Sequence, residues 1–156
     1  MLKRVFKLVR SNLFIAYRLA NSAMTLGVRA IVMDTRGEVL LVRHTYTDGW
    51  YLPGGGVERG ETMVGAIAKE LQDEANVALA APPKLLAMFH NTRHSRFDHV
   101  ALYLCVGAVQ VSPKEPDSEI AEAAYFPMDG LPDDITASTQ RRLEEFRTGG
   151  PYAENW

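Results

Sequence analysis

The sequence has little cysteine, little net charge and no long uninterrupted apolar stretch. A single cysteine, Cys105, occurs among 156 residues, so a disulfide bond within one chain is excluded and a cytoplasmic location is expected. The net charge is −2, which lacks the basic excess needed to bind a nucleic-acid polymer. No segment approaches the roughly 18 consecutive apolar residues of a transmembrane helix. The hydrophobic share of 47% is instead typical of one globular domain.

Residues 1–24 are both basic and apolar. Lys7, Arg10 and Arg18 interrupt every apolar run that a signal peptide would need. The segment predicts instead an amphipathic helix, whose apolar stripe consists of Leu2, Val5, Phe6, Val9, Leu13, Ala16 and Ala20. This helix is expected to pack on its own domain or across a homodimer, and the alternative is a membrane surface or another partner. The chain is then divided into this helix, a domain at 25–150 and a C-terminal tail at 151–156.

Beyond residue 24 the pattern predicts an α+β domain. The strands are mostly joined by hairpins and are expected at 27–34, 39–44, 84–90, 99–111 and 123–126. Helices are expected at about 62–75 and 137–149, the second capped by Thr136 or Ser138. More strands than helices, in this order, indicate a curved sheet with helices on its faces.

Three carboxylates gather in the segment KELQDEANV, residues 69–77. Glu70, Asp73 and Glu74 are spaced i, i+3 and i+4, so they lie on one side of the predicted helix, where like charges repel. They occupy the boundary between its apolar and polar faces. A bound cation would offset the repulsion, and the boundary would leave it open to a ligand. A solvated acidic surface is the alternative.

A glycine-rich segment precedes this helix, and the two together resemble the box of the Nudix hydrolase family, the MutT-like pyrophosphohydrolases. That box is a Gly, five residues, Glu, seven residues, Arg-Glu, an aliphatic residue, any residue, Glu-Glu, any residue, Gly and an aliphatic residue. The corresponding residues keep all of these spacings and are Gly55, Glu61, Lys69-Glu70, Leu71, Asp73-Glu74 and Asn76-Val77. The resemblance implies the Nudix fold, a mixed curved β-sheet sandwiched between helices, with the N-terminal helix as an addition.

Three positions depart from the family pattern. Lys69 replaces an arginine and keeps the charge without the planar fork of a guanidinium. Asp73 replaces a glutamate and keeps an oxygen ligand on a shorter side chain. Asn76 replaces the closing glycine at a helix end, where asparagine is the usual second choice for a left-handed backbone. Each replacement therefore preserves a property that the box needs.

The resemblance implies hydrolysis of a pyrophosphate bond in a nucleoside diphosphate linked to another group, or in a nucleoside triphosphate, with Mg²⁺ or Mn²⁺ as cofactor. Hard oxygen ligands suit both ions. Glu70 and Glu74 are implied as catalytic metal ligands with Asp73 in support, while Gly55 would shape the loop and Glu61 would anchor it or assist coordination. The alternative is a non-catalytic Nudix module that binds a small-molecule nucleotide as a sensor.

Further candidates lie outside the box. Family members often take another carboxylate from the loop after the long central strand, and here Glu119 is the first choice and Glu122 the second. In the segment HNTRHSRFDH, residues 90–99, arginines would hold phosphate and His94 or Phe97 would touch a base or sugar. The candidate substrate-binding residues are thus Arg43, which ends a strand beside His44, together with Arg93, Arg96 and Phe97. Ordinary surface positions are the alternative for each of them.

Overall fold

The computed structural model describes residues 24–93 and 95–156. The helix and the homodimer contact predicted for residues 1–24 lie outside these ranges, apart from Met24, and so does His94. None of the helices in the described ranges is long and apolar enough to cross a membrane.

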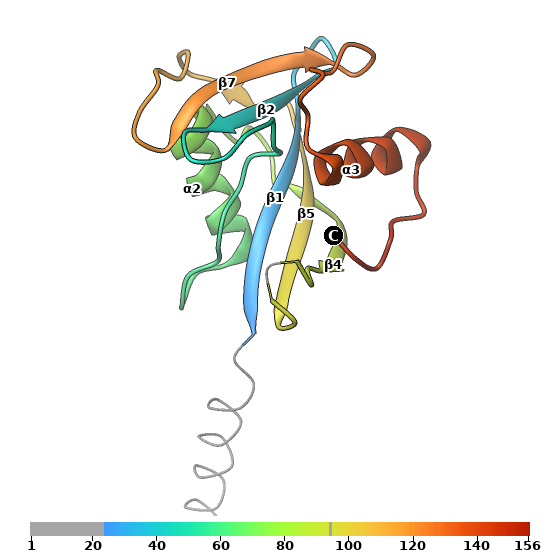
Figure 1. Ribbon diagram of the computed structural model, residues 1–156. Helices are drawn as coiled ribbons and strands as arrows, with labels where there is room; N and C mark the ends of the chain where they lie inside the picture. Colours follow the sequence, from blue (N-terminus) through green and yellow to red (C-terminus); the bar gives the residue numbers. More distant parts are fainter. Residues whose placement is uncertain (1–23, 94) are drawn as a thin grey trace, which may run out of the picture.

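A five-stranded mixed sheet forms the centre of the domain, as predicted (Figure 1). Its order is β4 (Lys84–His90), β5 (Asp98–Val106), β1 (Thr25–Met33), β2 (Glu38–His44) and β7 (Ile120–Pro127). All neighbours are antiparallel except β1 and β5, which run parallel over nine paired residues. Two short strands, β3 (Val77–Ala78) and β6 (Val109–Gln110), form a separate antiparallel pair.

The helices α2 (Met63–Ala75) and α3 (Ala137–Thr148) lie on opposite sides of this sheet (Figure 1). Burial of apolar side chains on each side stabilises the arrangement. The side with α2 contains Val28, Ala30, Ile67 and Leu71, and the side with α3 contains Ile31, Leu41, Leu102 and Leu143. The α+β sandwich is therefore confirmed.

Both helices begin at capping threonines. Thr62 accepts a hydrogen bond from the Gly65 amide at 3.0 Å, and Thr136 accepts one from the Thr139 amide at 3.4 Å. Each bond satisfies an N–H that has no partner within the helix. Thr136, rather than Ser138, is thus the cap of α3.

The long strand predicted at 99–111 is shorter than expected. Strand β5 ends at Val106, and Gly107 takes a φ of +68°, a left-handed conformation that ends the extended backbone. The chain then turns so that Val109 and Gln110 pair with β3. The apolar pattern of this segment continues through the turn, so it did not reveal the break.

The glycine-rich segment pairs with the part of β1 that β2 leaves unpaired. The Val28 amide donates to the Gly55 carbonyl at 2.8 Å, and the Ala30 amide donates to the Pro53 carbonyl at 3.0 Å. Gly54 has a φ of +136°, and a Cβ there would overlap the backbone of Val28. Only glycine fits this close approach. The segment is therefore fixed to β1 on one side and faces α2 on the other.

Asn76 ends α2 in the left-handed conformation expected from its place in the box, with a φ of +53°. Its side-chain amide donates to the Ser112 hydroxyl at 3.3 Å and to the Pro113 carbonyl at 3.1 Å. We expect Asn76→Ala to lower the free energy of unfolding by about 1–2 kcal/mol, because alanine is strained there and both bonds are lost. Asn76→Gly should lower the free energy of unfolding by less than Asn76→Ala does, since glycine adopts the left-handed conformation without strain.

Urea unfolding at a constant m value measures both variants. Equal losses for alanine and glycine would show that the left-handed backbone does not govern this position.

Residues beyond α3 pack back onto the domain. The Trp156 amide donates to the His90 carbonyl at 3.1 Å, and the His90 amide donates to the Glu154 carbonyl at 2.8 Å. The guanidinium of Arg142 is buried and stacks over the ring of Phe89, with its carbon 4.2 Å from the ring centroid. The segment predicted as a tail, 151–156, thus covers one end of β4.

Candidate active site

The carboxylates of α2 differ sharply in exposure. Glu74 is buried, with 3% of its surface exposed, Glu70 is half-buried and Asp73 is exposed. The helix is set so that Glu74 points beneath the glycine-rich segment, where its Oε2 accepts a hydrogen bond of 2.7 Å from the Gly54 amide. A single helical turn therefore presents its carboxylates at three depths, from the sheet outward to solvent.

The carboxylate of Glu70 lies directly over Gly55. A Cβ added to Gly55 would come within 2.5 Å of Oε1 and 2.8 Å of Oε2 of Glu70. The absence of a side chain at this position is what allows the carboxylate to reach the backbone. The opening glycine of the box thus has a direct steric role beside one of its glutamates.

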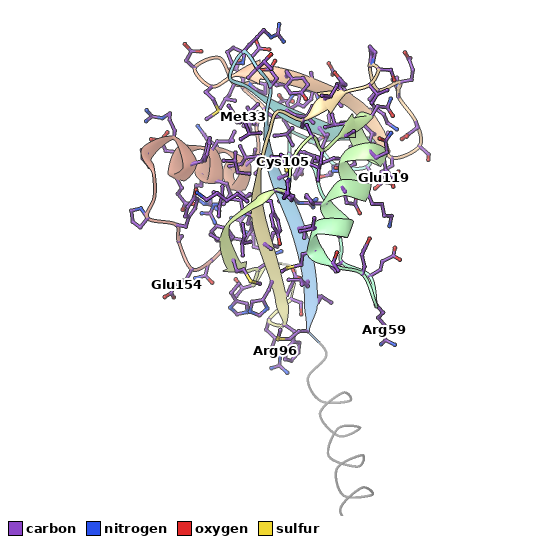
Figure 2. The ribbon with its side chains drawn as sticks, turned by 180° about the vertical axis from the view of Figure 1, so that it is seen from behind. Met33, Arg59, Arg96, Cys105, Glu119 and Glu154 are labelled. Atoms are coloured by element: carbon purple, nitrogen blue, oxygen red, sulfur yellow. The ribbon has the colours of Figure 1, made fainter. Side chains whose placement is uncertain are left out.

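Glu119 comes from the opposite side, on the loop before β7, and lies beside α2 (Figure 2). The turn that carries it is held by Asp117, whose Oδ1 accepts bonds from the amides of Glu119 at 2.8 Å and Ile120 at 2.7 Å. The Thr45 amide, just after β2, donates to the Glu119 carbonyl at 2.9 Å. Glu122, the second choice from the sequence, lies on β7 opposite Arg43 and does not line the cavity that Glu119 shares with the carboxylates of α2.

Glu119, Glu74 and His44 converge on one point. One ligand atom from each residue lies within 4.8 Å of the other two. A cavity of about 440 Å³ opens at this point and is lined by Lys69, Glu70, Asp73, Glu74, Lys114, Asp117, Glu119 and Ile120. Carboxylate oxygens with one imidazole form a donor set that suits Mg²⁺ and, more strongly, Mn²⁺. The residues present therefore fit a hard divalent cation.

Burial controls the protonation of this cluster. It raises the pKa of Glu74 to about 7, although the Arg29 charge and the Gly54 hydrogen bond oppose the rise. Burial also raises the pKa of Glu70 and lowers that of His44. Near neutral pH the imidazole is therefore uncharged, so its 3.9 Å approach to Glu74 is not an ion pair. A bound cation would replace the proton that Glu74 otherwise keeps.

This raised pKa gives a pH-dependent stability in metal-free protein. A carboxyl whose pKa rises from 4.5 to about 7 on folding stabilises the fold fully below pH 4.5, and that contribution is lost as the pH rises through 7. Glu74→Gln removes the ionisation. We therefore expect this variant in EDTA to exceed wild type in free energy of unfolding at pH 8, by on the order of 2 kcal/mol, with no difference at pH 4.

Urea unfolding of both proteins between pH 4 and 8 measures the difference. A constant gap across this range would contradict the assignment of the titration to Glu74.

The other box residues hold the loop. Lys69 forms an ion pair of 3.1 Å with Glu58, and the Glu58 amide donates to the Glu61 carboxylate at 3.0 Å. Glu61 thus closes a turn at 58–61, and it does not line the carboxylate cavity. The geometry accords with an anchoring role for Glu61 and places Lys69 at the edge of the cluster.

The arginines selected from the sequence lie away from the carboxylates. Arg43 pairs with Asp134 at 2.8 Å and stacks over Trp50, in a hollow that borders His44. Arg96 stacks on Phe97 in the loop between β4 and β5, at the far end of the sheet from Glu119 (Figure 2). Arg93 is exposed in the same loop. The structure therefore does not bring these side chains to the carboxylate cluster.

Arg29 is a residue that the sequence analysis did not select. It lies on β1 beside the glycine-rich segment, and its charge acts on Glu70, Glu74 and His44 together. Arg29 and Gly55 also line a large cavity of about 1080 Å³. An arginine inside an otherwise apolar strand, GVRAIVM, was the signal that could have indicated it.

A mixed sheet between two helices, with helix carboxylates gathered on a glycine-rich segment, defines the Nudix class of domain. The model of the NUDIX domain family matches residues 24–146. The chain therefore belongs to the Nudix family.

Curated relatives agree with this membership. The human 8-oxo-dGDP phosphatase NUDT18 is 33% identical over 121 residues, which cover 76% of this chain and 37% of that protein. The RNA pyrophosphohydrolase of Ruthia magnifica subsp. Calyptogena magnifica is 30% identical over 90 residues, 54% of this chain and 49% of the relative. The chain thus spans between a third and a half of the length of these relatives.

Solved structures show the same fold. The MutT NUDIX hydrolase from Burkholderia pseudomallei superposes with a TM-score of 0.66 at 23% identity, covering 78% of this chain and 97% of that one. At this identity the likeness concerns the fold alone.

Proposed function

We propose that this protein hydrolyses a phosphoanhydride bond in a nucleoside diphosphate derivative, with Mg²⁺ or Mn²⁺ held by Glu70 and Glu74 and supported by Asp73. The observation that carries the proposal is the convergence of Glu74, Glu119 and His44 beside the glycine-rich segment, at a cavity that Glu70 and Asp73 also line. The names of two relatives, an 8-oxo-dGDP phosphatase and an RNA pyrophosphohydrolase, support this reaction class. The family resemblance supports the metal.

The bound cation would neutralise phosphoryl oxygens and lower the pKa of an attacking water. The residues of the chain would hold the cation in position and accept the proton of the attacking water. Glu74 is fixed by the Gly54 amide and screened from solvent, so it is a rigid ligand. Glu119 is exposed on a loop and within reach of the same point, so it is placed to accept the proton of the attacking water.

A panel of nucleotides with Mg²⁺ or Mn²⁺ tests the function. The panel contains 8-oxo-dGDP, dGDP, 8-oxo-dGTP, ADP-ribose and a 5′-triphosphorylated RNA. We expect metal-dependent hydrolysis of at least one diphosphate and loss of activity in EDTA. Metal and nucleotide binding without any turnover would instead support the sensor alternative. Turnover that persists in EDTA would contradict the metal site.

Glu119→Gln separates the proposed base from its neighbour. We expect a fall in kcat of roughly 100-fold or more, since general-base catalysis contributes about 10²–10⁴-fold. Glu122→Gln is the matched control and should retain wild-type kcat, because that residue lies outside the cavity. A larger fall in kcat for Glu122→Gln than for Glu119→Gln would instead assign the general base to Glu122.

A cytoplasmic location and a homodimer formed through residues 1–24 stay predictions. The presence of a single cysteine supports the first, since a chain without an internal disulfide suits a reducing compartment.

A further inference from the structure

Arg29 is a half-buried cation that the described part of the chain leaves without a partner. Its Nη1 is buried and has no hydrogen-bond partner, and no ion pair in the described ranges includes this residue. A charged donor removed from water without a partner destabilises the fold. Such a group is retained most readily where a ligand supplies the missing acceptor.

The nearby glutamates do not supply that acceptor. Glu74 accepts from the Gly54 amide, and the carboxylate of Glu70 lies over Gly55, so neither forms an ion pair with Arg29. Once a divalent cation occupies these carboxylates, their charge is used in coordination. The charge of the guanidinium would then be uncompensated within the described ranges, and an anion from outside the chain would supply the acceptor.

The large cavity has a definite polarity along β1. Arg29 lines it beside Gly55, and Thr25 and Asp98 line it four residues back along the strand, a separation of roughly 13 Å at about 3.3 Å per residue. Asp98 is buried and accepts bonds from the Thr25 hydroxyl at 2.6 Å and the Asn91 amide at 2.8 Å. A phosphate is repelled at the Asp98 end and attracted at the Arg29 end.

On the basis of the proposed function, we propose that Arg29 binds a phosphate oxygen of the nucleotide whose nucleoside occupies this cavity. The planar guanidinium can hold two oxygens at once, which orients the phosphate as well as attracting it. Gly55 lines the same cavity as Arg29 and also lies against the carboxylate of Glu70. Arg29 thus orients the diphosphate so that it extends from the nucleoside cavity toward the metal ligands. The base of the bound nucleotide then lies toward Asp98.

A purely electrostatic role for Arg29 makes a different prediction. If the residue only offset the charge of Glu70 and Glu74, its removal would change metal affinity and leave nucleotide affinity alone. Ligand binding and metal binding must therefore be measured separately.

Calorimetry with α,β-methylene-GDP and with guanosine, in the presence of Mg²⁺, makes this separation. We expect Arg29→Gln to weaken binding of the diphosphate analogue by about 10- to 100-fold, because a hydrogen-bonded charge pair is lost. Guanosine, which lacks phosphate, should bind within about twofold of wild type, and Mn²⁺ affinity should not fall. The affinity of Arg29→Lys for the analogue should lie between those of wild type and Arg29→Gln, since lysine keeps the charge without the planar fork of the guanidinium. Arg147→Gln, an exposed arginine on α3, is the control for loss of charge and should match wild type.

Wild-type affinity for the analogue in Arg29→Gln would overturn the proposal. So would a wild-type protein that binds the analogue no better than guanosine, or a variant that loses analogue, guanosine and Mn²⁺ together. The proposed function fails by a different result, the absence of metal-dependent turnover in wild type, and this binding experiment does not depend on turnover.

Discussion

Glu74→Gln is expected to reduce hydrolysis severely while leaving a folded chain that, without metal and at high pH, is more stable than wild type. The carboxylate is buried, is fixed by the Gly54 amide and lies within 4.8 Å of ligand atoms on His44 and Glu119. A neutral amide there cannot replace an anionic ligand. Since a bound cation contributes several kcal/mol of charge stabilisation to the transition state, kcat/KM should fall by roughly 1,000-fold or more.

The control for this prediction is Glu122→Gln, which removes the same charge from an exposed position on β7. It should match wild type in kcat/KM and in Mn²⁺ affinity. Wild-type activity in Glu74→Gln, with binding of Mn²⁺ unchanged, would contradict the placement of the metal at α2.

Gly55→Ala is expected to reduce metal affinity and activity by about 10- to 100-fold, the usual effect of disturbing a group that orients a metal ligand. The added methyl group would come within 2.5 Å of the Glu70 carboxylate, so that carboxylate must turn away. The backbone of Gly55 is not in the left-handed region, so alanine causes no conformational strain at this position. The effect should therefore appear in Mn²⁺ titration and in kcat/KM more than in the free energy of unfolding.

The adjacent glycine provides a matched control. A Cβ on Gly56 meets no atom within 4 Å, and its φ is not positive. Gly56→Ala should therefore bind Mn²⁺ as wild type does. Equal losses of Mn²⁺ affinity in both variants would show that the flexibility of the loop governs metal binding and that the space below Glu70 does not.

The box spacing predicted the helix and its carboxylates because regular repeats determine which residues share one side of a helix. It placed Glu70, Asp73 and Glu74 together at a boundary, whereas the structure gives them three depths. That difference depends on how α2 is rotated against the sheet and on the close approach of Gly54 to β1. Neither can be derived from the spacing within one helix.

Long-range pairing accounts for most of what the sequence did not show. Arg29 is near the carboxylates only because residues 53–57 pair with β1, and the paired residues are 23 to 31 positions apart in the sequence. The choice of Arg93 and Arg96 as phosphate ligands rested on their charge in a loop, and the parallel pairing of β1 with β5 places that loop at the far end of the sheet. Glu119 was selected through the family resemblance, and its position opposite Glu74 depends on β7 pairing with β2.

The position of a bound Mn²⁺ ion tests the central claim most directly. Anomalous diffraction from crystals soaked in Mn²⁺ and α,β-methylene-GDP would locate the ion. Our account predicts an anomalous peak bound by the carboxylates of Glu70 and Glu74, next to Glu119 and in contact with the diphosphate. A peak elsewhere on the domain, or none at this cluster in crystals of protein that hydrolyses nucleotides in solution, would contradict it.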